Sequence, residues 1–284
     1  MSGMYLFPFG QADCFLLELD CGKVKSHILI DGGSKRWSGA SLYSYLEKVG
    51  VEELELMILT HLHQDHIGWL TEIAKNVKVN EAVLPISSEK LLSNMHCFQN
   101  IDLKKDFMEL QELEKNLNKS RAFVRIVSEL DDYYTFSIGD WNLTLIYPSK
   151  NIIMPFGSML RCEKMVDSLI SKINWDSMVW LLHSGKRMKA LFCGDCPEVC
   201  FLERFSHFKK ISGFTKEMDF LKLSHHGRND KGTVYFTNRI ITETGAKKII
   251  ITNVQENIPL LKKEWGDFVE NIMLMGEEEK WISF

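Results

Sequence analysis

Short apolar runs separated by turn-forming residues fill the first third of the chain. Runs at 4–9, 14–19 and 26–31 are rich in aromatic and branched residues, and "DCGK" and "DGGS" supply the turns, which predicts an opening β-meander. Residues 39–49 carry apolar positions at helical spacing, and 54–60 read as a buried strand. Strands therefore give way to a mixture of strands and helices, as in an α/β fold.

The second half of the chain continues this mixture. The stretch 177–195 predicts a hairpin whose second strand ends in Gly-Asp, and a helix at 198–208 follows. A strand at 218–227 ends in two histidines. A helix at about 259–271 and a terminal strand at 280–284 complete the pattern.

A long polar segment at about 87–130 interrupts this rhythm. Leu103, Phe107, Leu110 and Leu117 recur within it at helix spacing, which predicts one or two amphipathic helices inserted between strands. We expect these helices to pack on the body of the domain. Substrate capping and partner docking are the alternatives.

Composition limits the classes of protein that remain. The chain has 284 residues, of which 45% are hydrophobic, and no linker-like tract, so a single domain over 1–284 is expected. A net charge of −4 gives no overall attraction to nucleic acid, so a polyanion would need local cations or metal. Seven scattered cysteines favour a reducing compartment. With no leader or membrane-length apolar run, we expect a cytoplasmic protein that makes no membrane contact.

The chemistry is concentrated in "HLHQDH", residues 61–66, directly after the strand at 54–60. Imidazole and carboxylate are ligands that divalent zinc, manganese and iron accept, and one turn brings four such side chains together. Asp195 and His225 also follow predicted strands. The pattern therefore predicts a site for two divalent metal ions, Zn²⁺ or Mn²⁺.

Four motifs in this order resemble the metallo-β-lactamase fold superfamily: "DGG" at 31–33, "HLHQDH" at 61–66, "GD" at 194–195 and "SHHG" at 224–227. The resemblance implies an α/β (α+β) fold built as a four-layer αββα sandwich, with metals at the edge where the strand-end loops meet. It also implies a role for each residue. The first ion would bind His61 and His63, the second Asp65, His66 and His225, and Asp195 would bridge both, while Asp31 and Asp13 would orient ligand histidines.

A narrower resemblance is to the hydrolase domain of ComEC-like DNA-uptake proteins. It is carried by Gly10–Asp13, by the Asn-x-x-Ser at 174–177 and by "LKLSHHG" at 221–227. The membrane-spanning parts of those proteins are not in this sequence, so the hydrolase domain alone is implied. This resemblance favours phosphodiester bonds as the substrate.

Asn174 departs from the superfamily pattern. Most members carry a histidine near this position as a first-site ligand, and an amide oxygen is a weaker donor for zinc, although manganese accepts it. Asn174 is therefore either a weak metal ligand or a residue that caps the turn before the next strand.

Several further residues have more than one interpretation. Strand alternation would point His226 away from His225, so His226 joins Asp65 as a candidate catalytic group, as an acid or phosphate contact, or else supports the structure. Arg228 and Lys231 either contact substrate phosphates or belong to a solvated face. Cys193, Cys196 and Cys200 are spaced like metal ligands, but core thiols explain them better.

Three functions are consistent with these features. The leading hypothesis is a metal-dependent hydrolase that cleaves DNA or RNA through a metal-activated water. The second is a phosphodiesterase for a small substrate such as a cyclic nucleotide. The third is an effector subunit that acts only with a protein partner, for example in a defence system.

Overall fold

The computed structural model describes residues 1–37, 39–89, 101–150, 173–214, 217–227, 234–257, 272–275 and 278–284. The helix expected at about 259–271 lies outside these residues, as do Arg228 and Lys231.

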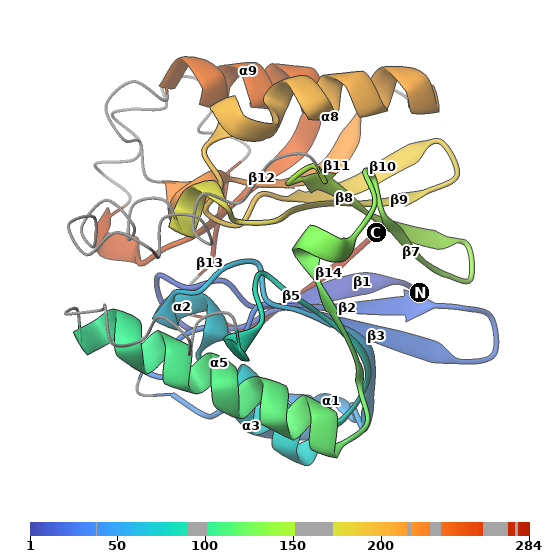
Figure 1. The fold of residues 1–284 in the computed structure, drawn as a ribbon. Coiled ribbons are helices and arrows are strands. Elements are labelled where there is room, and N and C mark those ends of the chain that lie inside the picture. Colours follow the sequence, from blue (N-terminus) through green and yellow to red (C-terminus); the bar gives the residue numbers. More distant parts are fainter. Residues whose placement is uncertain are drawn as a thin grey trace.

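Two seven-stranded sheets face each other, and helices cover their outer surfaces (Figure 1). This arrangement confirms the four-layer αββα sandwich. The order of strands in the first sheet is β14 (Lys280–Ser283), β1 (Gly3–Leu6), β2 (Phe15–Asp20), β3 (Lys25–Ile30), β4 (Glu53–Ile58), β5 (Lys78–Leu84) and β6 (Phe123–Ile126).

The second sheet is built from the C-terminal half of the chain. Its order is β13 (Ile272–Met275), β12 (Ala246–Thr252), β11 (Met218–Lys222), β10 (Arg187–Phe192), β9 (Val179–Ser184), β8 (Trp141–Tyr147) and β7 (Thr135–Ile138).

Helices of each half cover the sheet of the same half (Figure 1). The first sheet carries α1 (Leu42–Val49), α2 (Gln64–Ile67), α3 (Leu70–Asn76) and α5 (Ile101–Lys119), and the second carries α8 (Glu198–Ser212) and α9 (Val234–Thr244). Short 3₁₀ turns are η2 (Val127–Glu129), η4 (Ser224–Gly227) and η5 (Gln255–Asn257). Among the described residues, no helix has both the length and the apolar character needed to cross a bilayer.

The core consists of three apolar layers, because side chains alternate between the two faces of each strand. Leu17 of β2 points between the sheets, toward the layer that also holds Trp180 and Phe192. Its neighbour Leu16 points outward, into the layer under the helices. Since both faces are buried, the central strands are apolar at nearly every position.

The segment at 87–130 is helical only in part. Helix α5 packs on the first sheet through Phe107, Leu110, Leu113 and Leu117, which confirms the expected packing on the body of the domain. The chain then forms β6, which pairs in parallel with β5. The sequence analysis missed β6, because this edge strand is four residues long and exposes Phe123.

Parallel pairing brings the chemically active loops to one edge of the sandwich. In the first sheet β3, β4 and β5 run parallel, and in the second β10, β11 and β12 do. The carboxyl ends of the parallel strands in a sheet share an edge, where ligands bind in open α/β sheets. The motifs at 31–33, 61–66, 194–195 and 224–227 all follow such strands.

Candidate metal centre

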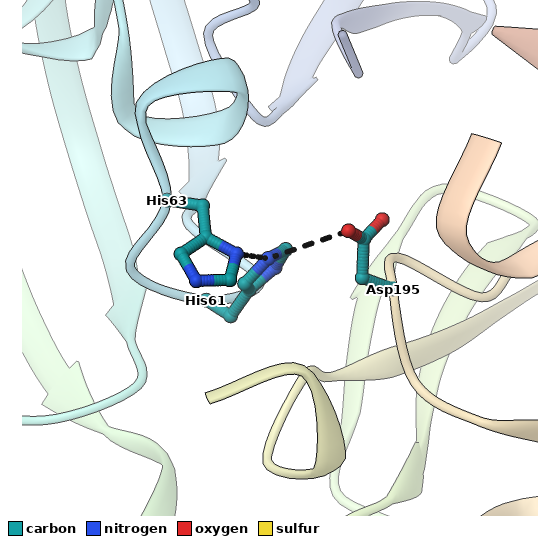
Figure 2. A group of neighbouring side chains, drawn as sticks. All are labelled: His61, His63 and Asp195. Atoms are coloured by element: carbon teal, nitrogen blue, oxygen red, sulfur yellow. Dashed lines mark hydrogen bonds and ion pairs between the residues drawn. The ribbon is translucent and has the colours of Figure 1, made fainter. Parts of the chain in front are cut away.

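The loop after β4 presents its polar side chains in one direction. β4 is buried up to Ile58, and the chain leaves the strand through Thr60 and His61, which are also buried. His63 is the N-cap of α2, a helix of four residues that includes Asp65 and His66. This tight turn places the motif side chains at the edge of the sheet, and Figure 2 shows two of them, His61 and His63, facing Asp195.

The "DGG" segment holds this loop in place at close range. The Gly32 amide donates to the His66 carbonyl at 2.6 Å, and the Trp69 amide donates to the Gly32 carbonyl at 3.1 Å. A Cβ on Gly68 would lie 2.0 Å from the Gly33 carbonyl oxygen, so no larger residue fits at this crossing. The glycines of the motif therefore permit a backbone contact that fixes the histidine loop.

One group of residues able to hold a metal ion is His61, His63 and Asp195. His61 Nε2 lies 3.0 Å from His63 Nδ1 and 3.7 Å from Asp195 Oδ2. Figure 2 shows the His61 ring between the other two side chains. The three ligand atoms lie within 4.8 Å of one another.

A second group is Asp65, His66 and His226. His226 Nε2 lies 3.2 Å from Asp65 Oδ2 and 3.6 Å from Asp195 Oδ1. His66 Nε2 lies 3.3 Å from the same Asp195 oxygen. Asp195 therefore stands between the two groups, with one carboxylate oxygen toward each.

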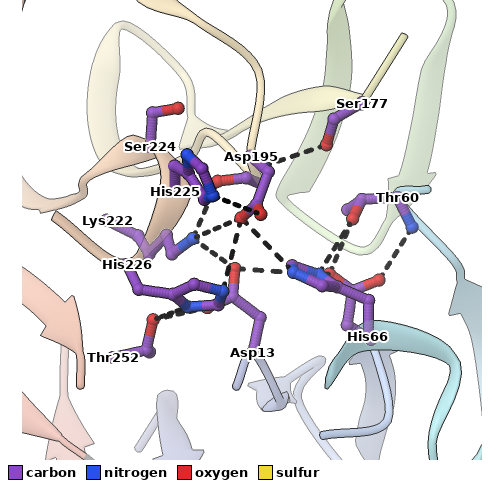
Figure 3. Close-up of polar contacts among 12 residues, drawn as sticks. Asp13, Thr60, His66, Ser177, Asp195, Lys222, Ser224, His225, His226 and Thr252 are labelled. Atoms are coloured by element: carbon purple, nitrogen blue, oxygen red, sulfur yellow. Dashed lines mark hydrogen bonds and ion pairs between the residues drawn. The ribbon is translucent and has the colours of Figure 1, made fainter. Parts of the chain in front are cut away.

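The two histidines of η4 do not follow strand alternation. His225 and His226 have φ of 50° and 54°, so both adopt the left-handed conformation, and both side chains turn toward Asp195 (Figure 3). His225 Nε2 lies 3.8 Å from Asp195 Oδ2, and His226 approaches Oδ1. The superfamily resemblance implied His225 for the group with Asp65 and His66, whereas the structure places His226 there.

Carboxylates and hydroxyls hold the far side of these imidazoles. Asp31 Oδ2 lies 2.8 Å from His66 Nδ1, and Asp31 also accepts hydrogen bonds from the amide and the hydroxyl of Thr60. A ring whose Nδ1–H donates to a carboxylate keeps the Nε2 lone pair free for a metal. This contact gives His66 the tautomer that a ligand needs.

A second chain of contacts supports His226. Its Nδ1 lies 3.0 Å from the Thr252 hydroxyl, which donates to Asp13 Oδ1 at 2.5 Å. The other oxygen of Asp13 forms an ion pair with Lys222 (Figure 3). Asp13 therefore joins the start of the chain to the strand that precedes the tandem histidines.

Lys222 is a buried cation that the sequence analysis did not single out as a site residue. It is 1% exposed, and its ammonium donates to the Gly194 carbonyl at 2.8 Å and lies 4.0 Å from Asp195 Oδ1. The signal was available, because a lysine in the apolar run "FLKL" must find a buried charged or polar partner. That partner is Asp13.

The buried charges shift one another's protonation. Burial would lower the pKa of His66, but Asp195 and Asp31 outweigh it and hold this pKa well above its usual range. Burial would also lower the pKa of His226, but Asp195 and Asp13 raise this pKa to about 9. Burial would raise the pKa of Asp195, but His226 and His66 keep it well below its usual range. Imidazolium protons therefore balance the carboxylates, a role that bound cations would take over while releasing those protons.

Two buried atoms fit a metal ion better than they fit each other. His66 Nε2 and Asp195 Oδ1 are buried and, within the described part of the chain, neither has a hydrogen-bond partner. Buried polar atoms rarely stay unsatisfied, and a missing ion is one recognised cause. The donor set of imidazoles and carboxylates is the kind that Zn²⁺ and Mn²⁺ accept. The residues present therefore fit divalent metal.

The remaining candidates are less directly placed. Asn174 is half-buried, and its side-chain oxygen has no hydrogen-bond partner among the described residues. Cys193 and Cys196 are buried in the apolar layer under α8, and the described metal-capable groups contain no cysteine. Core packing therefore accounts for these thiols.

A sequence profile of the metallo-beta-lactamase superfamily matches residues 7–138, which include β2 to β6 and the histidine loop. The order of the sheets and the placement of the motifs agree with that match. Residues 7–138 therefore match the metallo-β-lactamase superfamily, and the described part of the chain has the fold of that superfamily. Its fold and metal-capable cluster are those of a metallo-hydrolase.

Solved structures of this fold cover the whole chain at low sequence identity. A metallo hydrolase from Ignicoccus hospitalis, Igni18, has a TM-score of 0.53 and 12% identity over 99% of both chains. The metallo-beta-lactamase fold protein YhfI from Bacillus subtilis has a TM-score of 0.51 and 14% identity, with 98% of this chain and 99% of that one covered. CmlA beta-hydroxylase has a TM-score of 0.52 and 12% identity, and the chain spans 54% of its length. These likenesses concern the fold alone. No match was found among curated proteins.

Proposed function

We propose that this metallo-β-lactamase-fold protein is a metal-dependent phosphodiesterase that cleaves DNA or RNA. The observation that carries the proposal is the contact of Asp13 with both Lys222 and His226. These residues belong to two of the three sequence motifs that resemble ComEC-like hydrolase domains, and they meet beside the candidate metal centre (Figure 3). The narrower resemblance therefore corresponds to one connected group of side chains.

The side chains would divide the work as follows. Asp65, His66 and His226 would hold one divalent ion, His61 and His63 the other, and Asp195 would contact both. Two divalent ions, when bound, activate a water and neutralise charge on the phosphoryl oxygens. Lys222 places a fixed positive charge beside Asp195, and it orients the loop through the Gly194 carbonyl.

His226 is better suited to hold an ion than to protonate a leaving group. It is 1% exposed, and its two ring nitrogens face Thr252 on one side and Asp65 on the other. A general acid must reach the substrate directly or through one water. The geometry therefore favours a ligand role for His226, which is neither of the two roles expected for it from the sequence.

The test is a hydrolysis panel on the purified protein with Mn²⁺ or Zn²⁺. Its substrates are single- and double-stranded DNA, RNA, cyclic mononucleotides, cyclic dinucleotides and bis(p-nitrophenyl) phosphate. We expect cleavage of at least one polymer, lost by at least about 100-fold in His63→Ala and Asp195→Ala. His207→Ala, a histidine of α8 that stacks on Tyr133, is the matched control and should keep the rate.

The panel separates the alternatives. Cleavage of cyclic nucleotides without cleavage of any polymer would replace the nuclease by a small-substrate phosphodiesterase. Absence of hydrolysis across all substrates and both metals would overturn the proposal.

A further inference from the structure

The tandem histidines divide between the two oxygens of Asp195. Oδ1 faces His66 Nε2 at 3.3 Å and His226 Nε2 at 3.6 Å. Oδ2 faces His61 Nε2 at 3.7 Å and His225 Nε2 at 3.8 Å. The four imidazoles thus form two pairs, one for each carboxylate oxygen.

These separations are those of atoms that share a metal ion. Two ligand atoms of a tetrahedral zinc, with bonds of about 2.0 to 2.2 Å, lie about 3.3 to 3.6 Å apart. The Oδ1 pair lies within this range, and the Oδ2 pair exceeds it by 0.1 to 0.2 Å. The distances from Oδ2 to His225 and to His61 therefore agree to within 0.1 Å.

The backbone is held in a costly conformation that produces this division. Two successive non-glycine residues in the left-handed region are energetically unfavourable, and such strain gathers at functional sites. The turn is secured from both sides, because the His225 amide donates to the Gly194 carbonyl at 3.1 Å and Asn253 Nδ2 donates to the His226 carbonyl at 3.0 Å. In an extended strand the two rings would point to opposite faces.

The first group lacks an imidazole where the superfamily pattern would supply one. Asn174 stands near that position, and an amide oxygen binds zinc weakly. Without a further donor, His61, His63 and Asp195 would give the first ion three protein ligands, whereas Asp65, His66, His226 and Asp195 would give the second ion four.

We propose that His225 supplies the missing imidazole of the first ion site, so that each histidine of the tandem pair serves a different ion. The assignment rests on the proposed function only in requiring that two ions bind. The His225 side chain is 24% exposed, so the first ion would lie on the solvent side of Asp195. Each ion then has four protein donors.

Metal binding without substrate tests the assignment. Apo protein is titrated with Co²⁺, with calorimetry for stoichiometry and affinity and visible absorption for coordination number. His63→Ala removes a first-site ligand and Asp65→Ala a second-site ligand, so each single variant keeps one ion. His225→Ala is then added to each background, and His225→Gln, closer in size to histidine, is measured in parallel.

The two backgrounds give opposite expectations. In Asp65→Ala the remaining ion occupies the first site, and His225→Ala should weaken its binding by more than about 100-fold. This loss is larger than that expected for a residue that only hydrogen-bonds to a ligand. In His63→Ala the remaining ion sits on the second site, and the same change should leave its Kd within about threefold. His207→Ala in either background should change nothing.

The reverse pattern would overturn the assignment by placing His225 on the second site. The assignment would also be overturned if His225→Ala changed the Kd of the remaining ion equally in both backgrounds. A wild-type protein that takes up fewer than two ions would overturn it as well. A protein that binds two ions with the expected pattern but hydrolyses no phosphodiester would reject the proposed function alone.

Discussion

The two halves of the candidate metal centre differ in how deeply they are built into the protein. In the half around Asp195 Oδ1, His66 and His226 are 0% and 1% exposed. Behind them stand Asp31, Thr252 and Asp13, themselves buried. In the half around Oδ2, His63 is half-buried and His225 is 24% exposed. The first half lies in the core, whereas the second combines the buried His61 with two partly exposed histidines, His63 and His225.

Protonation follows the same division. Burial lowers the pKa of His61 and of His63, so both rings are neutral at pH 7 and can bind a cation directly. The carboxylates around His66 and His226 outweigh burial and raise their pKa, so these rings hold protons that an ion must displace. The inner half is therefore preorganised but carries its own countercharge, while the histidines of the outer half hold no protons that an ion must displace.

Removing the buried cation behind the inner half should have the largest effect. Lys222→Met leaves the Asp13 carboxylate buried without its ion-pair partner, and breaking one side of a buried pair costs about 3–5 kcal/mol. We expect the free energy of unfolding of the metal-free protein to fall by that amount, measured by urea denaturation. Lys78→Met, which removes an exposed pair with Glu53, should cost at most about 1 kcal/mol.

The double variant Asp13→Asn/Lys222→Met sharpens this result. If the pair is the cause, the double variant loses less than the sum of the two single variants. Additive losses would show that Lys222 acts through packing instead, and the contrast between the inner and outer halves would lose its electrostatic basis.

The same pair should appear in the response to acid. Burial would raise the pKa of Asp13, but Lys222 and His226 lower it to about 2, below its ordinary value of 3.8. A carboxyl with a lowered folded-state pKa contributes stability that is complete above the unfolded value and is lost as pH falls through the folded one. We expect the metal-free protein to lose stability between about pH 4 and pH 2.

Urea denaturation at steps across this range measures the effect. In Asp13→Asn the part of the slope due to this carboxyl should vanish, while Asp20→Asn, an exposed carboxyl near the N-terminus, should keep it. Identical slopes in wild type and Asp13→Asn would contradict the prediction.

The fold and most of the metal-capable residues could be predicted from sequence, because strand endings and ligand types are local signals. His61, His63, Asp65 and His66 lie within six positions, so one turn must bring them together. Asp195 lies in the Gly-Asp that ends a predicted strand, so its position and residue type also indicated a metal ligand. The resemblance of the sequence motifs to the superfamily then predicted the αββα order of the layers.

The division between His225 and His226 could not be predicted, because it depends on the backbone rather than on residue type. Alternation along β11 ends before η4, where both residues turn left-handed. The role of Lys222 depends on Asp13, which lies more than 200 positions earlier in the chain, and no periodic pattern connects them. β6 was missed because it has only four residues, of which Ile126 alone is buried, so its polarity pattern gives little signal.

The smallest effects should separate the halves ion by ion. Asp31→Asn keeps the size of the side chain but can present an amide N–H to His66 Nδ1, which favours the tautomer with the proton on Nε2 and blocks the metal side. The second ion should weaken by about 10–100-fold, the usual cost of losing such an orienting partner. Measured by Co²⁺ calorimetry in the His63→Ala background, this loss is read directly on the remaining ion.

Ser177→Ala is the corresponding change beside His61, and it also removes the acceptor of the hydrogen bond from the Asp195 amide. The Ser177 hydroxyl lies 3.3 Å from His61 Nδ1, but the Thr60 hydroxyl also lies 3.2 Å from that nitrogen and remains after the substitution. The first ion, measured in the Asp65→Ala background, should therefore weaken by less than about 10-fold. If Ser177→Ala weakens metal binding more than Asp31→Asn does, the outer half depends on hydrogen bonds to its ligands at least as much as the inner half. Burial would then not explain the difference between the two halves.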